Sequence, residues 1–534
     1  MSTSPEPPGP ATLPDDPATA GPVGKDGDKL DRALLATASV VVLGAIMSIL
    51  DVTVVNVAIN TLARDFQTTL TTIQWVATGY TLALATVIPL TAWGAERFGT
   101  KRLYLISITL FVLGSALAGT AWDATSLIVF RVLQGLGGGM IMPIGMMILT
   151  RAAGPSRVGR VMAVMGVPML LGPVAGPILG GWLVDSYSWR WIFFINLPIG
   201  ILAVILATRI LPRDARGGKA KLDVLGLALL SPGLALLIYG LAETGAEGGF
   251  GHPKVLIPAI VGALLLVGFV LHALRVEKPL INLRLYRNKV FAASNVTLVL
   301  MIIAVFGGML LMPLYLQIVR GESALNTGLL LAPQGLGAML AMPVAGQLAD
   351  RTGVGRIVPV GLALVGGAFA WLTGLEANTS YWHLSIALFV MGIGMGLTMM
   401  PTFTGAMQTL RRASIPSAST SLNINQQVAA SLGTAVLSVL LVSAMSSKLA
   451  TLPGAGADGG GGALEGLAAL PREVFAQVQP LLAQAFGQTF WWALGFVAVA
   501  FVVALVLLPK HKPAPVEEDD ADADASAGPP VMMH

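Results

Sequence analysis

Runs of about 20 apolar residues recur along the whole of this 534-residue chain, and each is long enough to cross a bilayer as a helix. Hydrophobic residues make up 55% of the chain and charged residues only 11%, whereas soluble domains are about 25% charged. The sequence therefore predicts an all-α membrane protein. We expect fourteen spans, at about 34–58, 72–94, 103–121, 125–149, 161–183, 191–211, 223–242, 255–274, 290–319, 327–348, 357–375, 384–407, 421–445 and 487–508.

Lysine and arginine are concentrated in every second connection between these spans. If the N-terminus is inside, 25 of the 32 basic residues fall on the inner side and six on the outer side. Basic residues favour cytoplasmic loops. This bias predicts a plasma (inner) membrane protein whose two termini are both cytoplasmic.

The sequence lacks the residues that several functional classes require. The chain has no cysteine, and its five histidines are scattered without metal-ligand spacing, so we expect no metal site. No basic stripe with interleaved aromatic residues indicates nucleic-acid binding. The spans contain no nucleophile–base pair, and we therefore predict that the protein is not an enzyme and needs no cofactor.

The first span, Ser39–Asn60, carries Asp51 well inside its apolar run. A charged side chain at the centre of a membrane helix costs about 2.5–3.5 kcal/mol on insertion scales, and such residues commonly serve proton relay, ion binding or substrate recognition. No other acid lies as deep in a predicted span. We interpret Asp51 as functional; the alternative is a structural acid that neighbouring helices satisfy.

Arg131, in the predicted fourth span, is the only basic residue inside a span, and its partner should be an acid or backbone carbonyls. At 1.5 Å per residue, Asp51 lies about 25 Å above the inner end of its helix and Arg131 about 9 Å below the outer end. Across a core of about 30 Å the two are at similar depth. A direct or network contact between them is therefore feasible.

The fifth span has a regular glycine pattern. Gly172, Gly176 and Gly180 recur every four residues and share one helix face. Pro173 and Pro177 lie beside them and would bend the helix, and Gly181 follows. Small residues are common at any membrane helix interface, but this phased pattern favours a specialised hinge or seal.

Two cytoplasmic loops carry similar sequences. WGAERFGTKR occupies 93–102 and GQLADRTGVGR occupies 346–356, in matching positions of two halves. Such pairs are typical of duplicated transporter folds. We predict that charged residues of these loops latch the halves together on the cytoplasmic side. The predicted latch comprises Glu96, Arg97, Gly99, Lys101, Asp350, Arg351 and Gly353.

The repeat sets the predicted domain organisation. A six-helix bundle at 34–211 is followed by two inserted helices with their linkers at 212–289, and by a second six-helix bundle at 290–509. A long outer loop is expected at 446–486. The ends, 1–33 and 510–534, are rich in Pro, Ala, Gly and acidic residues, which predicts disordered cytoplasmic tails.

Together these motifs resemble the major facilitator superfamily, and within it the fourteen-helix drug:proton antiporters of the EmrB/QacA type. The resemblance runs from about 50 to 508 and includes LDVTVVNVAI, LIVFRVLQGLGGG, GPVAGPILGG and SWRWIFFINLPIG. It implies two six-helix bundles with an extra helix pair, a proton-coupling Arg131 and an antiporter motif on the fifth span. The first loop departs from the family pattern at Glu96, where Asp is usual.

We therefore predict proton-coupled export of hydrophobic or amphipathic small molecules by alternating access, as in multidrug efflux. The alternatives are export of a lipid or endogenous metabolite and, with less support, uptake. The proton gradient would supply the energy and a monomer would suffice; an accessory periplasmic adaptor is expected only if the cell has an outer membrane. Polar, aromatic and methionine side chains would line the cavity: Asn56, Trp75, Tyr80, Gln134, Met140, Tyr315, Gln317, Gln334, Asn423 and Gln426.

Overall fold

The structure is a computed structural model that describes residues 32–510, except for 69, 154–171, 173–174, 177, 185, 213–220, 247–249, 278, 323, 412–413 and 450–471. Within these residues the secondary structure is helical, because in hydrocarbon every backbone N–H and C=O must find its partner within the protein. Twelve described helices are long and apolar enough to cross a membrane, and one bent pair makes up to thirteen. The predicted fifth span falls largely outside the described residues, as do most of both predicted tails.

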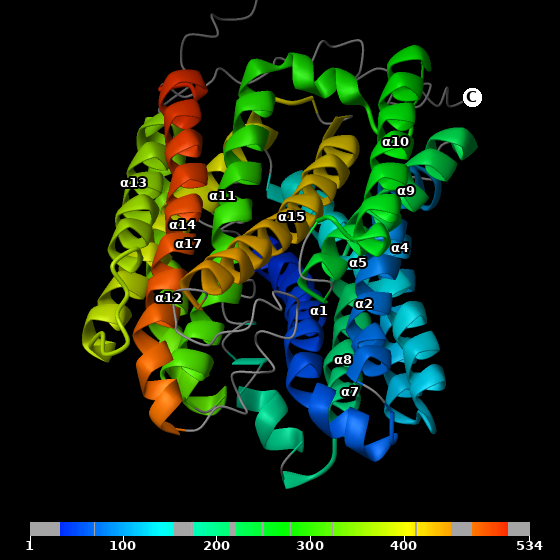
Figure 1. Cartoon of the computed structure of the whole chain (residues 1–534). Helices are drawn as coiled ribbons and strands as arrows, with labels where there is room; N and C mark the ends of the chain where they lie inside the picture. The colour runs from blue at the N-terminus through cyan, green and yellow to red at the C-terminus, as the bar shows by residue number, and fades with distance from the viewer. Residues whose placement is uncertain are drawn as a thin grey trace, which may run out of the picture.

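The helices of the first half precede the inserted pair and those of the second half follow it (Figure 1). The first half contains α1 (Arg32–Asp65), α2 (Leu70–Val87), α3 (Leu90–Phe98), α4 (Thr100–Gly119), α5 (Ala124–Ala153), α7 (Trp191–Phe194) and α8 (Asn196–Ile210). The inserted pair is α9 (Val224–Ala246) and α10 (Pro253–Arg275), joined to the second half through the short helix η3 (Leu283–Arg287). The second half contains α11 (Lys289–Leu314), η4 (Tyr315–Val319), α12 (Ala324–Thr352), α13 (Val354–Leu372), α14 (Tyr381–Gln408), α15 (Ile415–Leu449) and α17 (Arg472–Leu507).

The predicted second span is broken rather than continuous. Its two pieces, Trp75–Val87 and Leu90–Phe98, meet at an angle of 56°. Pro89 lies at the break, where its ring removes one backbone donor and interferes with the preceding helical turn. The bend turns α3 towards α15 of the second half.

Part of the predicted outer loop 446–486 is also helical. α15 continues to Leu449, and α17 begins at Arg472. The early turns of α17 pack on the second half near the end of η4. There Gln479 donates to the Val319 carbonyl at 2.6 Å, and Phe486 meets Tyr315 edge-on at 5.8 Å between ring centres. These contacts explain why a segment of only moderate hydropathy is helical.

The inserted pair packs across one side of the molecule and contacts both halves. The α9 hydroxyl of Ser231 donates to the Thr86 carbonyl of α2 at 2.7 Å, and Tyr239 stacks on Trp75. Apolar side chains of α9 and α10 form a cluster with Ile424 and Val428 of α15. The pair therefore covers the seam between α2 and α15.

Asp223 joins the two ends of the inserted pair that lie on the side predicted by the basic residues to be inner. Its carboxylate accepts from the Gly226 N–H at 2.8 Å and the Leu280 N–H at 3.2 Å, and contacts His272 Nε2 at 2.8 Å. Partial burial alone would raise the pKa of Asp223, but these donors outweigh it and hold the pKa below its usual value. This contribution to stability is thus present near neutral pH and is lost as the pH falls through the lowered pKa.

The two loops of the sequence repeat have the same backbone shape. Gly99 has φ 86° and ψ 156°, and Gly353 has φ 87° and ψ 150°. Each glycine separates a helix that ends in a basic turn from the next helix of its half. Only glycine adopts this region readily, so the shared shape supports a duplicated origin for the two halves.

We predict that Gly353→Ala lowers the free energy of unfolding by about 1–3 kcal/mol, because an alanine is strained at this φ and ψ. Gly367→Ala is the matched control: this glycine lies within α13, and an added Cβ meets nothing within 4 Å. The thermal unfolding midpoint of the detergent-solubilised protein measures both. Equal effects of the two substitutions would contradict the prediction.

Candidate proton and substrate sites

Asp51 and Arg131, which the depth estimate placed at a similar level, form a direct ion pair. Arg131 Nη1 lies 2.5 Å from Asp51 Oδ2, and both side chains are at most 1% exposed. α1 and α5 bring the two residues together. A buried pair with one partner removed is destabilised by about 3–5 kcal/mol, because an uncompensated charge remains. The pair is thus a strong constraint on how these helices pack.

Two side-chain amides complete the hydrogen bonding of the carboxylate. Gln134 Nε2 donates to Asp51 Oδ1 at 2.8 Å, and Asn196 Nδ2 donates to the same oxygen at 2.9 Å. Arg131 also donates to Gln134 Oε1 at 2.8 Å and to the Val76 carbonyl at 3.2 Å. Asp51 thus accepts from Arg131, Gln134 and Asn196, all of which are donors, as a carboxylate requires.

Aromatic faces enclose the guanidinium group of Arg131. Its central carbon lies 4.1 Å from the ring centre of Tyr80 and 5.7 Å from that of Phe193. Arginine gains cation–π attraction in this geometry, most strongly where water is excluded. Tyr80 and Gln134, which the sequence assigned to the substrate cavity, are therefore parts of the ion-pair site.

Asn196 and Ser115 are site residues that sequence reasoning did not single out. Asn196 Nδ2 also donates to Ser115 Oγ at 3.0 Å, and Ser115 Oγ donates to the Phe193 carbonyl at 2.9 Å. The available signal was an amide at the centre of SWRWIFFINLPIG, next to an apolar helix. Polar side chains in such positions often bond across helices.

The glycine face of the fifth span lies against α1. A Cβ added at Gly172 would collide with Ile49, and one at Gly176 would collide with Thr53. Thr53 Oγ1 also donates to the Gly172 carbonyl at 3.2 Å. At Gly180 an added Cβ would come within 3.0 Å of Val54, whereas at Gly181 it would meet nothing. Three of the glycines thus allow close approach to α1, on both sides of Asp51 in the sequence. Pro173 and Pro177 lie outside the described residues.

Lys101, one of the predicted latch residues, bonds to the end of α8. Its ammonium donates to the carbonyls of Thr208 and Leu211, at 2.8 and 2.5 Å. These carbonyls end α8, where a cation is favoured by the helix dipole. These two contacts of Lys101 lie within its own half, and the contact across the interface stays a prediction. Glu96, Arg97 and Arg351 are exposed, and the side chain of Asp350 is outside the described ones.

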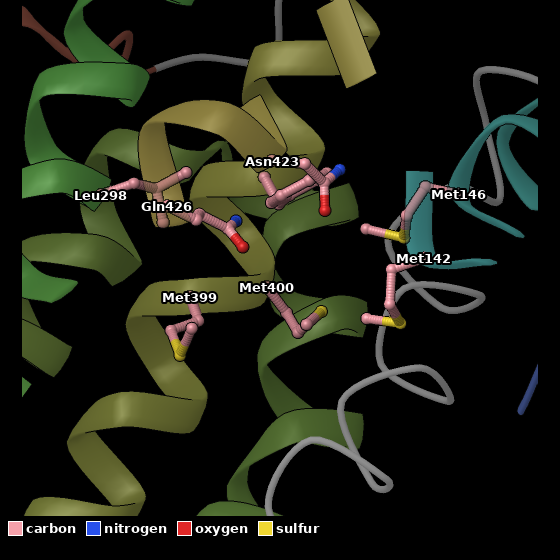
Figure 2. A pocket seen from close by; sticks show the side chains of 8 residues that line it. Met142, Met146, Leu298, Met399, Met400, Asn423 and Gln426 are labelled. Carbon is pink, nitrogen blue, oxygen red and sulfur yellow. The ribbon is translucent and has the colours of Figure 1, made fainter. Parts of the chain in front are cut away.

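A pocket with four methionines among its eight lining residues lies between the halves, and Figure 2 shows it from close by. In this conformation the pocket is nearly closed: the volume open to a water-sized sphere is about 10 Å³, enough for about one water molecule. α5 supplies one wall and helices of the second half supply the others. The lining residues are Met142, Met146, Leu298, Met399, Met400, Phe403, Asn423 and Gln426.

Asn423 and Gln426 are the predicted cavity residues that line this pocket, and they are its polar members. Beside it, Ser419 Oγ of α15 donates to the Pro143 carbonyl of α5 at 3.1 Å, which joins the two halves. The sequence drew attention to the number of methionines, but periodicity alone could not say which of them face one another.

The other predicted cavity residues lie elsewhere. Trp75 stacks on Tyr239 of the inserted pair, and Met140 is buried in the core of the first half. The Tyr315 hydroxyl donates to the Glu376 carbonyl at 2.6 Å. Gln317 is exposed, Gln334 Nε2 contacts Met395 Sδ at 3.3 Å, and the side chain of Asn56 lies outside the described ones.

Comparison with known proteins supports the class of membrane transporters that the fold defines. The profile of the Major Facilitator Superfamily matches residues 41–434. The chain is 46% identical over 507 residues to the Multidrug resistance protein B homolog of Mycobacterium tuberculosis, covering 91% of this chain and 93% of that protein. It is 31% identical to the Multidrug export protein EmrB of Haemophilus influenzae, covering 76% and 80%.

A solved structure of the human organic anion transporter MFSD10 (TETRAN) has a similar fold. The TM-score is 0.55 at 14% identity, covering 87% of this chain and 99% of the other. The chain belongs to the Major Facilitator Superfamily and is of the EmrB type within it. It is a multi-pass membrane protein.

We predict that Gly176→Ala lowers the free energy of unfolding by about 1–3 kcal/mol, because its Cβ would overpack the contact with Thr53. Gly181→Ala, five residues further on, should change it by less than about 0.5 kcal/mol. Thermal unfolding in detergent compares the two variants. A tolerated alanine at 176 would mean that this face is not closely packed in solution.

Proposed function

We propose that this protein exports hydrophobic or amphipathic small molecules in exchange for protons, as a multidrug efflux transporter of the plasma membrane with both termini cytoplasmic. The observation that carries the proposal is the fully buried Asp51–Arg131 ion pair, because ionisable side chains inside a membrane span commonly serve proton or substrate transfer. The names of its relatives, multidrug resistance and multidrug export proteins, support the cargo class.

Asp51 is suited to bind and release a proton because its charge is costly in the membrane and is held by one cation. Protonation removes the negative charge and leaves Arg131 to be stabilised by Tyr80, Phe193, Gln134 and a backbone carbonyl. The balance of charge at the site therefore changes. A change of this kind biases a two-state equilibrium between outward and inward forms.

Helix α1 gives this change a mechanical route. Ile49 and Thr53, on either side of Asp51 in the sequence, are the residues that meet the glycine face of the fifth span. A shift of α1 at Asp51 thus alters a contact in which the fifth span has only glycine backbone and no side chain that could adjust. Small displacements at tightly packed contacts favour discrete rearrangement over gradual deformation.

The methionine-lined pocket is the proposed cargo site, and movement of the two halves would have to open it before cargo could enter. Thioether side chains are flexible and polarisable, so they adapt to apolar molecules of different shape. Asn423 and Gln426 add hydrogen-bonding groups, and the lining contains no charged side chain. We therefore expect neutral and weakly charged amphipathic cargo, without a strict requirement for a cation.

The proton and cargo sites are separate along α5. Arg131 and Met142 are eleven residues apart, or about 16 Å along the helix axis. At this separation we do not expect proton and cargo to compete for the same side chains. Coupling would instead operate through the conformation of the two halves, as alternating access requires.

We predict that Asp51→Asn abolishes the response of transport to a pH gradient. In proteoliposomes, reversing the gradient should reverse net cargo flux for the unmodified protein, while the variant should carry cargo at the same low rate in either gradient. Glu376→Gln, an exposed acid on an outer loop, is the control and should behave as the unmodified protein. Flux indifferent to gradient direction in the unmodified protein would remove proton coupling.

We predict that Met142→Trp weakens cargo binding at least tenfold by filling the pocket, whereas Met142→Leu conserves volume and changes affinity by less than about threefold. Quenching of intrinsic fluorescence by a lipophilic dye measures the affinity. Asp51→Asn should retain dye binding, because its site is distant. Unchanged affinity in a folded Met142→Trp variant would place the cargo site elsewhere.

A further inference from the structure

The hydrogen bonds around Asp51 are arranged for its charged form. Oδ2 accepts from Arg131, and Oδ1 accepts from the amides of Gln134 and Asn196. A protonated carboxyl group has one O–H that needs an acceptor. An unsatisfied donor is costly in a buried site. One of the neighbouring amides must therefore present its oxygen when the proton arrives on Oδ1.

Gln134 is held in its present orientation by Arg131. Its Oε1 accepts from Arg131 Nη1 at 2.8 Å while its Nε2 faces Asp51. Arginine offers only donors. Turning the Gln134 amide over would place its NH₂ group against the guanidinium, so this amide cannot supply the acceptor without breaking the pair.

Asn196 has no such restriction. The second partner of its Nδ2 is the hydroxyl of Ser115, 3.0 Å away. A hydroxyl can donate or accept. If the Asn196 amide turns over, its oxygen can accept from both Asp51 and Ser115, and the Ser115 proton turns away from the Phe193 carbonyl, which it now meets at 2.9 Å.

We propose that Asn196 and Ser115 are positioning residues that reverse the direction of their hydrogen bonds when Asp51 is protonated. The inference deepens the proposed function and rests on it, because it assigns the groups that sense the proton. No covalent bond changes except that the proton joins Asp51 Oδ1. The reversal releases the Phe193 carbonyl of α7, next to the start of α8, and so connects the proton site to α4, α7 and α8.

The charged and titratable surroundings leave this role to the amide. Arg131 of α5 contacts Asp51 directly, and Tyr80 of α2 interacts with it electrostatically from its place over the guanidinium. The groups that α4 and α8 turn to the site, Ser115 and Asn196, do not titrate. Among the described residues around Asp51, only Asn196 combines contact with Oδ1 and a reversible second partner.

Infrared spectroscopy of the purified full-length protein tests the reversal without requiring transport. The carboxylic-acid band that appears on acidification and is absent in Asp51→Asn reports Asp51. Gln134→Leu removes a donor from the charged form alone, and should move the pH midpoint of this band upwards by about one to two units. Asn196→Leu removes a partner from both forms, and should move it by less than half as much. Equal upward shifts would identify Asn196 as a fixed donor and overturn the proposal.

A second measurement uses the unmodified protein and so does not depend on a variant that folds. Acidification should shift a side-chain amide vibration that responds to heavy-nitrogen labelling of asparagine and is lost in Asp51→Asn. A shift that responds only to labelled glutamine would also overturn the proposal. If the infrared results agree with expectation but Asp51→Asn still follows a pH gradient, the reversal stands and proton coupling through Asp51 fails. If the gradient response depends on Asp51 and the two leucine variants shift equally, only the reversal fails.

Discussion

The ion pair between Asp51 and Arg131 is the interaction on which the first half of this protein depends. Two opposite charges placed in a region from which water is excluded must be matched in position and number by donors and acceptors. The site meets this requirement with groups from six helices: α1 and α5 supply the charges, and α2, α4, α7 and α8 supply the aromatic and hydrogen-bonding surroundings. A change in the protonation of the Asp51 carboxylate therefore affects the packing of all these helices.

The two halves contribute different parts of the proposed transport machinery. Only the first half holds a buried ion pair among the described residues, whereas the second contributes most of the methionine-lined pocket. The glycine face beside Asp51 lies next to the charged site, and the pocket lies further along α5. A change in the protonation of Asp51 can then alter the pocket through movement of whole helices, without direct contact between proton and cargo.

Much of the fold and the two charges could be predicted, because apolar length, loop charge and a lone acid in hydrocarbon are local properties of a sequence. The break at Pro89 and the early start of α17 were not, since both depend on contacts with distant helices. Asn196, Ser115 and the particular methionines of the pocket were missed for the same reason: one amide or thioether in a span has no periodic signal, and its partners are distant in sequence.

The inserted pair has unequal attachments to the two halves. Ser231 and Tyr239 tie α9 to α2 through a directional hydrogen bond and a ring stack, whereas its contact with Ile424 and Val428 of α15 is apolar. Apolar contact has no preferred direction and tolerates sliding. The two inserted helices would thus move with the first half, while their apolar face can slide over α15 of the second half. They can therefore keep that side of the interface covered while the two halves move relative to each other.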